Sequence, residues 1–534
     1  MRRLARRSLR ALAAAIAATV ALLAAERVAD RFAPPPLGRL AGIPESVRVE
    51  ARDGTLLRVT ATPSGERAVR VRLADVSPHV LSAIVAGEDR RFRDHAGVDA
   101  FSLARAVGSL VRRGRAVSGA STITMQVARL LEPRPRTLAA KLREMWRARQ
   151  IERALTKDEI LEAYVNLAPL GRAVRGFEAA SAYWFGKSAR DLAPEEAALL
   201  VAMLPAPSRR APDRAPALAR RFRDRVLDRM REDGALSARE HARATAAPLG
   251  AAPHAWPFLA PHAADLALAA GTAGGVVRLG LDLALQRRAE DAVAAQDGAG
   301  ADGVAVVVLD RETADIRALV GSRDYRARPL DASRCRRSAG STLKPFLYAL
   351  AFESGVVAPD GLVLDVPGRF GDYRPENFAG DYCGRMRAAD ALSESRNLPA
   401  VRLLDAVGVE SFREVLRRSG VALGPRPLTL DAALGTVAIS PLELARAYVE
   451  LARDDSAAAV REALSRRSPA LGVLAPGRVA WKTGTSSGRR DAWCVGVTEN
   501  LVAVVWMGRL DGGSAPDLVG ARAAAPLLAA VLAE

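Results

Sequence analysis

A serine and a lysine in the second half of the chain have the types and spacing needed for acyl transfer. Ser341 and Lys344 lie in the sequence GSTLK, and a separation of three residues places both side chains on one face of a helix. Pro345 is tolerated only near a helix start, so we expect the helix to begin about residues 340–342, with Ser341 at its amino terminus. There the helix dipole favours a developing negative charge, and a neighbouring lysine with a depressed pKa can accept the serine proton.

Two further motifs follow in order, SRN and KTGTS. They contribute Ser395, Asn397, Lys482, Thr483, Gly484 and Thr485. S-x-x-K alone arises by chance in long proteins, but the ordered trio S-x-x-K, S-x-N and K-T-G is typical of penicillin-binding proteins and class A β-lactamases. The second half of the chain therefore resembles the transpeptidase domain of penicillin-binding proteins.

This resemblance implies a role for each polar residue of the first two motifs and for the third-motif lysine. Ser341 is implied to be the acylated nucleophile, and Lys344 is implied to be its base. Ser395 and Asn397 are implied to relay the proton and to orient the substrate. Lys482 is implied to shape the electrostatic field of the site.

The rest of the third motif is implied to bind the substrate. Thr483 and Thr485 would hold the substrate carboxylate, Gly484 between them would also contact the substrate, and the backbone N–H groups of Ser341 and Thr485 would form the oxyanion hole. The implied substrates are D-Ala-D-Ala stem peptides, which β-lactams imitate.

The first half of the chain holds a second group of motifs, between about residues 78 and 210. They are GEDRRFRDHAGVD, GASTITMQVAR, KLREM and NLAPLGRAVRGFEAASAYWFGK. Glu-Asp beside Arg-Arg also fits an ordinary charged loop, but the four motifs together resemble those of the family 51 peptidoglycan glycosyltransferases, in order and spacing. The candidate residues that they contribute are Glu88, Asp89, Phe92, His95, Ser121, Thr122, Thr124, Gln126, Arg129, Lys141, Glu144 and Asn166.

Sugar transfer with inversion needs a carboxylate that deprotonates the acceptor hydroxyl and positive charge that stabilises the departing diphosphate. The resemblance implies that Glu88 is this base and that Glu144 assists near the diphosphate. It implies phosphate contacts for Arg129 and Lys141, and substrate contacts for the remaining candidates. It requires no cofactor but allows a divalent cation, Mg²⁺ or Mn²⁺, at the diphosphate.

The amino terminus has the pattern of a membrane-targeting segment. Five arginines within residues 2–10 precede the apolar run Ala11–Ala25, which fits either an uncleaved signal anchor or a cleaved signal peptide. Both interpretations leave the arginines in the cytoplasm and place the rest of the chain outside it. We expect a single-pass protein of the inner (cytoplasmic) membrane, with its catalytic domains in the periplasm.

Hydrophobic periodicity predicts the elements that position these motifs. Helical patterns dominate the first motif group, as in LREMWRARQIERAL and PEEAALLVAML, whereas GVAVVVLD, IRALVGS and the hairpin AWCVGVTEN–LVAVVWMG read as strands around a helical middle. The expected fold is multidomain: a mainly α, lysozyme-like glycosyltransferase, then an α+β, β-lactamase-like transpeptidase with an antiparallel sheet. The expected segments are 1–30 (tail and anchor), 31–75 (linker with short β segments), 76–235 (glycosyltransferase), 236–275 (connector) and 276–534 (transpeptidase).

Composition excludes several other classes of protein. The net charge is +18, but the chain lacks a nucleic-acid-binding motif and its arginines are spread along the sequence, so we expect no nucleic-acid partner. The histidines and cysteines lack the spacing of a zinc site. Three cysteines leave at least one unpaired, and Cys335–Cys383 is the pair we consider.

Taken together, the motifs identify a candidate member of the bifunctional, class A penicillin-binding proteins, most like the 1C branch. The implied partners are lipid II, the growing glycan strand, stem peptides, β-lactams as inhibitors, the membrane and cell-wall synthesis proteins. An alternative stays open: a glycan polymerase whose penicillin-binding domain acts only as a sensor or a weak carboxypeptidase. That branch usually carries a further C-terminal β domain, for which the residues after Gly484 are too few.

Overall fold

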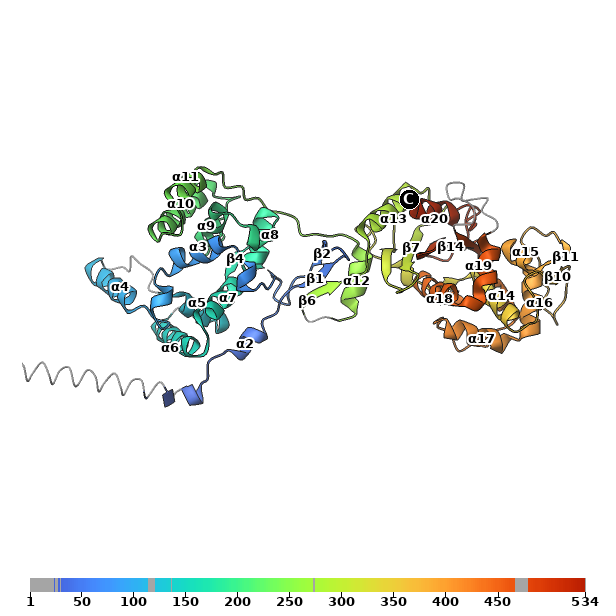
Figure 1. Cartoon of the computed structure of the whole chain (residues 1–534), viewed down its shortest axis with the longest axis horizontal. Coiled ribbons are helices and arrows are strands. Elements are labelled where there is room, and N and C mark those ends of the chain that lie inside the picture. Colours follow the sequence, from blue (N-terminus) through green and yellow to red (C-terminus); the bar gives the residue numbers. More distant parts are fainter. Residues whose placement is uncertain are drawn as a thin grey trace, which may run out of the picture. The chain divides into compact units, whose positions relative to one another are not determined.

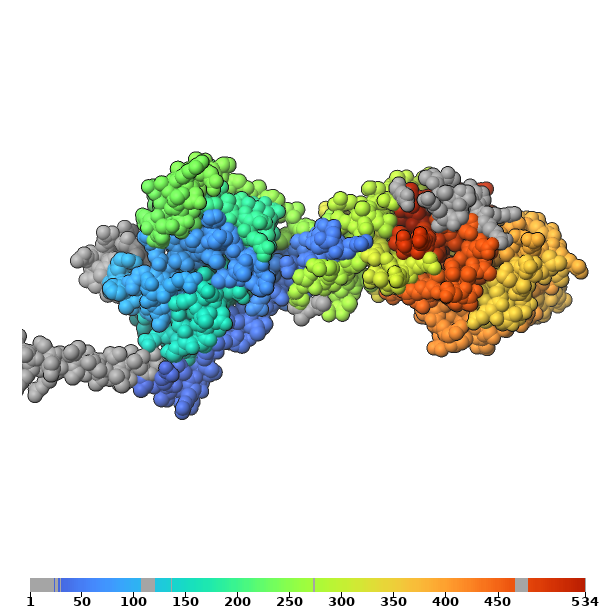
Figure 2. Space-filling view, viewed as in Figure 1, coloured from blue at the N-terminus to red at the C-terminus, as the bar shows by residue number. Residues whose placement is uncertain are grey.

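The chain forms two compact units (Figures 1 and 2). The structure, a computed structural model, describes residues 30–113, 121–135, 137–271, 274–465 and 479–533 and positions 24, 27 and 28, with only the backbone over 107–113. Unit 1 comprises residues 1–48, 59–257 and 272–276, and unit 2 comprises residues 49–58, 258–271 and 277–534. The five segment boundaries expected from the sequence stay predictions.

The predicted anchor lies, except for Ala24, outside the described residues. Within the described ranges, no helix is both long enough and apolar enough to cross a bilayer.

Unit 1 is mainly helical. The apolar run predicted to be a helix forms α9, whose residues are buried along almost the whole length, as expected for a helix without a polar face. The helices α3 and α10 pack against α9, which fixes the carboxyl end of α3, where Glu88 stands. The helices are α2 (Gly38–Ala41), α3 (Pro78–Glu88), α4 (Ala100–Arg113), α5 (Ile123–Leu131), α6 (Leu138–Ala154), α7 (Lys157–Leu167), α8 (Phe177–Phe185), α9 (Pro194–Met203), α10 (Pro216–Glu232) and α11 (Ala238–Ala246).

Short strands occur where the sequence predicts them, at residues 45–75. A small sheet of order β3-β5-β4 in unit 1 joins β3 (Arg67–Ala68) to β5 (Val174–Arg175) and β4 (Pro169–Gly171). A second sheet has the order β2-β1-β6. One boundary between the sequence segments of the two units falls within each of its three strands. Its strands are β1 (Val47–Glu50), β2 (Leu56–Val59) and β6 (Gly275–Arg278).

Unit 2 is built on a five-stranded antiparallel sheet of order β13-β14-β15-β7-β8. The predicted strands and the carboxyl-terminal hairpin are confirmed. Strand β7 is buried from Gly303 to Leu309, and a strand covered on both faces reads as a continuous apolar run. Its residues Val304, Val306 and Val308 pack with α13 and α20, while α18 also contacts β7 and β15. The strands are β7 (Gly303–Asp310), β8 (Ile316–Val320), β13 (Ala480–Thr485), β14 (Asp491–Val497) and β15 (Leu501–Gly508).

Helices fill the sequence between β8 and β13, so the α+β expectation is confirmed. The hairpin β10 (Leu362–Asp365) and β11 (Gly384–Arg387), and the short pair β9 (Arg337–Ser338) and β12 (Ala438–Ile439), also lie there. The helices of unit 2 are α12 (Pro261–Ala269), α13 (Leu283–Ala295), α14 (Lys344–Glu353), α15 (Ala388–Ser393), α16 (Asn397–Val407), α17 (Val409–Arg418), α18 (Pro441–Arg453), α19 (Ala458–Ser465) and α20 (Ala524–Leu532).

Two sequence-based details differ from the structure. The predicted helix start at residues 340–342 is a 3₁₀ turn, η5 (Gly340–Leu343), and α14 begins only at Lys344. Pro345 then occupies the first turn of α14, where its missing N–H costs nothing. The pairing Cys335–Cys383 is wrong, because all three cysteines are free thiols and Cys335 donates to the carbonyl of Asp331 instead.

Candidate active sites

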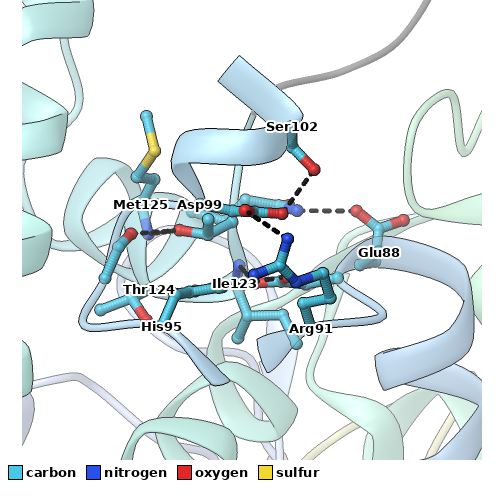
Figure 3. A network of polar contacts seen from close by, with 12 residues as sticks. Glu88, Arg91, His95, Asp99, Ser102, Ile123, Thr124 and Met125 are labelled. Atoms are coloured by element: carbon cyan, nitrogen blue, oxygen red, sulfur yellow. Dashed lines mark hydrogen bonds and ion pairs between the residues drawn. The ribbon is translucent and has the colours of Figure 1, made fainter. Parts of the chain in front are cut away.

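The first candidate site surrounds Glu88 at the end of α3. Gln126 Nε2 on α5 donates to Glu88 Oε2 at 2.7 Å, and Tyr164 Oη on α7 donates to Gln126 Oε1 at 3.2 Å. Figure 3 shows the bond made by the Glu88 carboxylate. The tyrosine thereby fixes which end of the Gln126 amide faces the carboxylate. Burial raises the pKa of Glu88, and the Gln126 bond opposes that increase. The structure thus brings together two predicted residues, and Tyr164 is a neighbour that sequence reasoning missed.

Three arginines add a positive field at Glu88, and each one stabilises its ionised form. Arg129 was a sequence candidate, whereas Arg210 and Arg229 were not. Arg210 lies 3.5 Å from the ring centroid of Phe222 and donates to a backbone carbonyl of α9 at 2.7 Å. Arg229 donates to the carbonyl of Gly87 at 2.8 Å. In so arginine-rich a sequence, no local signal distinguishes these two from solvated arginines.

The first-motif residues after Glu88 fasten one loop to the start of α5. Asp89 accepts hydrogen bonds from His95 Nε2 and from the backbone N–H of Ile123, all at 3.1 Å (Figure 3). Thr122 caps α5 and donates to the carbonyl of Gly97 at 2.6 Å. Phe92 in the same loop is fully buried. Asp89, His95, Phe92 and Thr122 therefore stabilise the loop and its attachment to α5. Contacts of these residues with substrate stay predictions.

A second polar group in unit 1 joins the second and third motifs. Lys141 Nζ donates to Ser121 Oγ at 2.6 Å and to Glu144 Oε2 at 3.1 Å. Glu144 is the one carboxylate of this group and it accepts from an ammonium, so a divalent cation here would take most of its ligands from the diphosphate and water; the cation stays a prediction. Across the described ranges, no group of three histidine, cysteine, aspartate or glutamate residues could hold a metal ion.

The side chains of two other candidates, Thr124 and Asn166, form hydrogen bonds within the protein. Thr124 Oγ1 donates to Glu152 Oε1 at 2.5 Å, and Lys157 Nζ donates to the same oxygen at 2.7 Å. The side chain of Asn166 pairs with both backbone groups of Val71, at 2.9 Å each. The structure therefore ties Asn166 to the chain before α3, and a substrate contact for either candidate stays a prediction.

The second candidate site contains Lys344, which is completely buried. Its Nζ donates to Asn397 Oδ1 and to the carbonyl of Ser395, both at 2.7 Å, and to the carbonyl of Arg396 at 3.0 Å. Burial and the nearby charge of Lys482 hold the pKa of Lys344 well below its usual range. The S-x-x-K lysine and the S-x-N motif, predicted to act together, are in direct contact.

Lys482 on β13 contacts the same motif. Its Nζ donates to Ser395 Oγ at 2.8 Å and to the carbonyl of Thr483 at 2.8 Å. Burial lowers the pKa of Lys482 to about 7. Ser395 adopts a left-handed φ of 61°, unusual for a serine, so the backbone is strained where its hydroxyl meets Lys482.

Glycines allow the turn with the nucleophile to approach the edge strand β13 closely. A Cβ added to Gly340 would lie 2.8 Å from the carbonyl oxygen of Thr485, and one added to Gly484 would lie 2.8 Å from that of Ala339. The turn η5, which contains Ser341, therefore packs closely against β13 at Thr485, and the oxyanion hole stays a prediction. Thr485 Oγ1 accepts from the backbone N–H of Gly520 at 3.0 Å, which orients its hydroxyl.

We expect Gly340→Ala to reduce acylation at Ser341 by at least about 100-fold. The residue has a φ of +54°, and the added methyl would overlap the backbone of Thr485, so the turn must move by a distance that typically costs this much. Gly371→Ala, also at positive φ but with open space around the new Cβ, is the matched control. The measurement is the labelling rate with a fluorescent penicillin, and equal rates in both variants would contradict the close-approach argument.

Comparison with known protein families assigns both halves of the chain. Residues 53–231 match the transglycosylase family model. Residues 304–461 match the model of the penicillin-binding protein transpeptidase domain. The Glu88 site lies in the first match, and Ser341, Lys344, Ser395 and Asn397 lie in the second.

Two relatives resemble the chain over most of its length. The chain is 39% identical to penicillin-binding protein 1C of Escherichia coli over 94% of its own length and 69% of that protein. It is 30% identical to penicillin-binding protein 1F of Bacillus subtilis over 82% of its length and 70% of that protein. A crystal structure of penicillin-binding protein 1A from Haemophilus influenzae, at 18% identity, shares the fold with a TM-score of 0.56 and 92% coverage of both chains. With a transglycosylase domain followed by a penicillin-binding transpeptidase domain, the chain belongs to the class A, bifunctional penicillin-binding proteins.

Proposed function

We propose that unit 1 polymerises lipid II into glycan strands and that unit 2 cross-links the stem peptides through an acyl-serine intermediate. The observation that supports this most directly is the presence of two separate reactive centres. One is a buried carboxylate in the positive field of three arginines, and the other is a pair of buried lysines that both bond Ser395, with Ser341 in the turn that leads into Lys344.

In the polymerisation step, Glu88 takes the proton from the acceptor hydroxyl as that oxygen attacks the anomeric carbon. Gln126 holds the carboxylate oxygen that it contacts, so the other oxygen faces the acceptor. The bond to the diphosphate breaks, and undecaprenyl diphosphate leaves. Arg129 and Lys141 stabilise its charge, with Glu144 orienting Lys141. No step of this scheme needs a metal ion.

In the cross-linking step, Ser341 Oγ attacks the carbonyl carbon between the two D-alanines, and its proton passes to the amine of Lys344. The terminal D-alanine leaves with a proton, and the acyl group stays on Ser341. An amine of a second stem peptide then takes the acyl group and regenerates the serine. A β-lactam acylates the same oxygen by opening its ring. Ser395, bonded to Lys482, can pass protons between the lysines and the leaving group.

Lipid II turnover with and without penicillin tests both halves of the proposal. Glycan strands should form in both samples, and cross-links only without penicillin. Strands without cross-links in either sample would favour the sensor alternative. Released D-alanine without cross-links would favour the weak carboxypeptidase.

We propose that unit 1 works at the outer surface of the inner membrane. Exposed apolar side chains support this: Phe101 on α4 is 71% exposed, and Leu138 and Leu142, which flank Lys141 on α6, are 79% and 59% exposed. The segment that follows the predicted anchor is attached to the same helix, because Arg147 donates to the carbonyls of Ala33 and Pro34 at 2.9 and 2.8 Å. Anchor and apolar residues would then reach the bilayer together.

Deleting residues 1–29 is expected to slow polymerisation in vesicles yet leave measurable binding to liposomes, because the exposed apolar side chains remain. The deletion stops before Asp30, which bonds Gln150 at 2.6 Å. Adding Leu138→Gln and Leu142→Gln should weaken the residual binding further, because only Phe101 of the three exposed apolar side chains then remains. Co-sedimentation with liposomes is the measurement, and a truncated protein that never co-sediments would rule out this second membrane contact.

A further inference from the structure

A chain of polar contacts runs from the acylation site to a buried carboxylate that neither catalytic scheme uses. Asn397 bonds Lys344 with its side-chain oxygen at 2.7 Å. Its backbone N–H, at the first residue of α16, donates to Asn377 Oδ1 at 2.8 Å. Asn377 Nδ2 in turn donates to Asp365 Oδ1 at 2.7 Å. Asp365 is completely buried, and Asn377 is 6% exposed.

The hydrogen-bonding pattern fixes the orientation of both amides. Asn377 must present its nitrogen to Asp365 and to the carbonyl of Asp381, at 2.7 and 2.8 Å, and its oxygen to an N–H. Asn397 must present its nitrogen to the carbonyl of Glu376, at 2.7 Å. Only its oxygen then remains for Lys344. Glu376 and Asn377, neighbours in the loop between β10 and β11, thus determine that the side-chain oxygen of Asn397 is the atom that contacts Lys344.

Asp365, the last residue of β10, bonds the loop that follows it at a second point as well. Its second oxygen accepts from the backbone N–H of Cys383 at 3.0 Å. The guanidinium of Arg396, in the centre of the S-x-N motif, lies 3.6 Å from that oxygen and 2.9 Å from Asp381 Oδ1. The loop between β10 and β11 is therefore bonded to the backbone and side chains of the motif that contacts Lys344.

We propose that Asp365 and Asn377 are positioning residues of the acylation reaction, which hold Asn397 and, through it, the amine of Lys344 in the place from which it takes the Ser341 proton. The inference rests on the acyl-serine chemistry proposed for unit 2. It adds two residues outside the three motifs and assigns a function to a loop that contributes none of the motif residues.

The charge of Asp365 gives this role a signature that a purely structural role lacks. The charged groups that act on Lys344 are Lys482, which lowers its pKa, and Asp365, which opposes that effect. Asp365 itself faces Arg396 and the buried phenol of Tyr348. Removing its charge without changing its size should lower the pKa of Lys344 further. The acid limb of the acylation profile should then move to lower pH.

The test compares Asn377→Leu and Asp365→Asn with the wild type and with Asp372→Asn, a fully exposed aspartate of the same loop as matched control. The second-order labelling rate with a fluorescent penicillin is measured across pH. We expect the labelling rate of Asn377→Leu to be about 10- to 100-fold lower than that of the wild type. The acid limb of its pH profile should not move. Asp365→Asn should shift the limb down by about one pH unit, and Asp372→Asn should match the wild type.

Thermal melts identify variants that do not fold. If only one of Asn377→Leu and Asp365→Asn folds, the result for that variant tests the proposal. A folded Asn377→Leu within about threefold of the wild-type rate, or a folded Asp365→Asn with an unmoved limb, would overturn the proposal. A wild-type protein that is not labelled at all would instead overturn the proposed acyl-serine chemistry, so the two failures are distinguishable.

Discussion

Replacing Glu88 with glutamine is expected to abolish glycan polymerisation and to leave penicillin acylation intact. Glutamine keeps the size of the side chain and can still accept from Gln126, so only the ability to take a proton is lost. General base catalysis contributes about 10²- to 10⁴-fold to such rates, and acylation should persist because Ser341 lies in the other unit. The measurement is the length distribution of strands made from labelled lipid II.

The matched control is Glu232→Gln, at the end of α10 in the same unit, with a side chain 61% exposed. It should polymerise at the wild-type rate. Wild-type polymerisation should also fall as the pH drops through the raised pKa of Glu88, because only the ionised form is a base. A folded Glu88→Gln protein that polymerises normally would show that another group removes the proton.

The motifs supplied candidate residues for unit 1 but not their contacts. Glu88, Gln126, Lys141 and Glu144 were candidates because each belongs to a motif of fixed order, whereas the bonds Gln126–Glu88 and Lys141–Glu144 come from the structure. The field around Glu88 could not be predicted in full. Arg210 and Arg229 reach it only because α9 and α10 pack against α3, and the sequence contains no record of that tertiary packing.

Unit 2 shows the same division between local and long-range information. Strand β7 and the hairpin β14–β15 were predictable because apolar runs with turn residues between them encode strands locally. The chain from Asp365 through Asn377 to Asn397 was not predictable, because its bonds join residues 12 and 20 positions apart. Each of these side chains taken singly resembles an ordinary polar loop residue.

Lys344→Arg is expected to lose penicillin acylation about as completely as Ser341→Ala, with glycan polymerisation preserved in both. Arginine keeps the positive charge but cannot release its proton, whereas burial and Lys482 favour a neutral Lys344. The three acceptors around Lys344 Nζ pull the other way by stabilising the ammonium. Complete burial prevails, so the pKa stays lowered, and wild-type acylation should rise with pH as the neutral amine becomes populated.

Lys482→Arg should be milder, because its hydrogen bond to Ser395 and its charge can be supplied by a guanidinium. Lys187→Arg is the matched control, since Lys187 pairs with Glu196 in the other unit at 2.7 Å. The second-order labelling rate with a fluorescent penicillin is compared for all four variants, with thermal melts to identify misfolding. A folded Lys344→Arg protein within about tenfold of the wild-type rate would end the general-base assignment. The Ser341 proton would then have to leave through Ser395, whose hydroxyl already contacts Lys482, and Lys482→Arg would become the more damaging change.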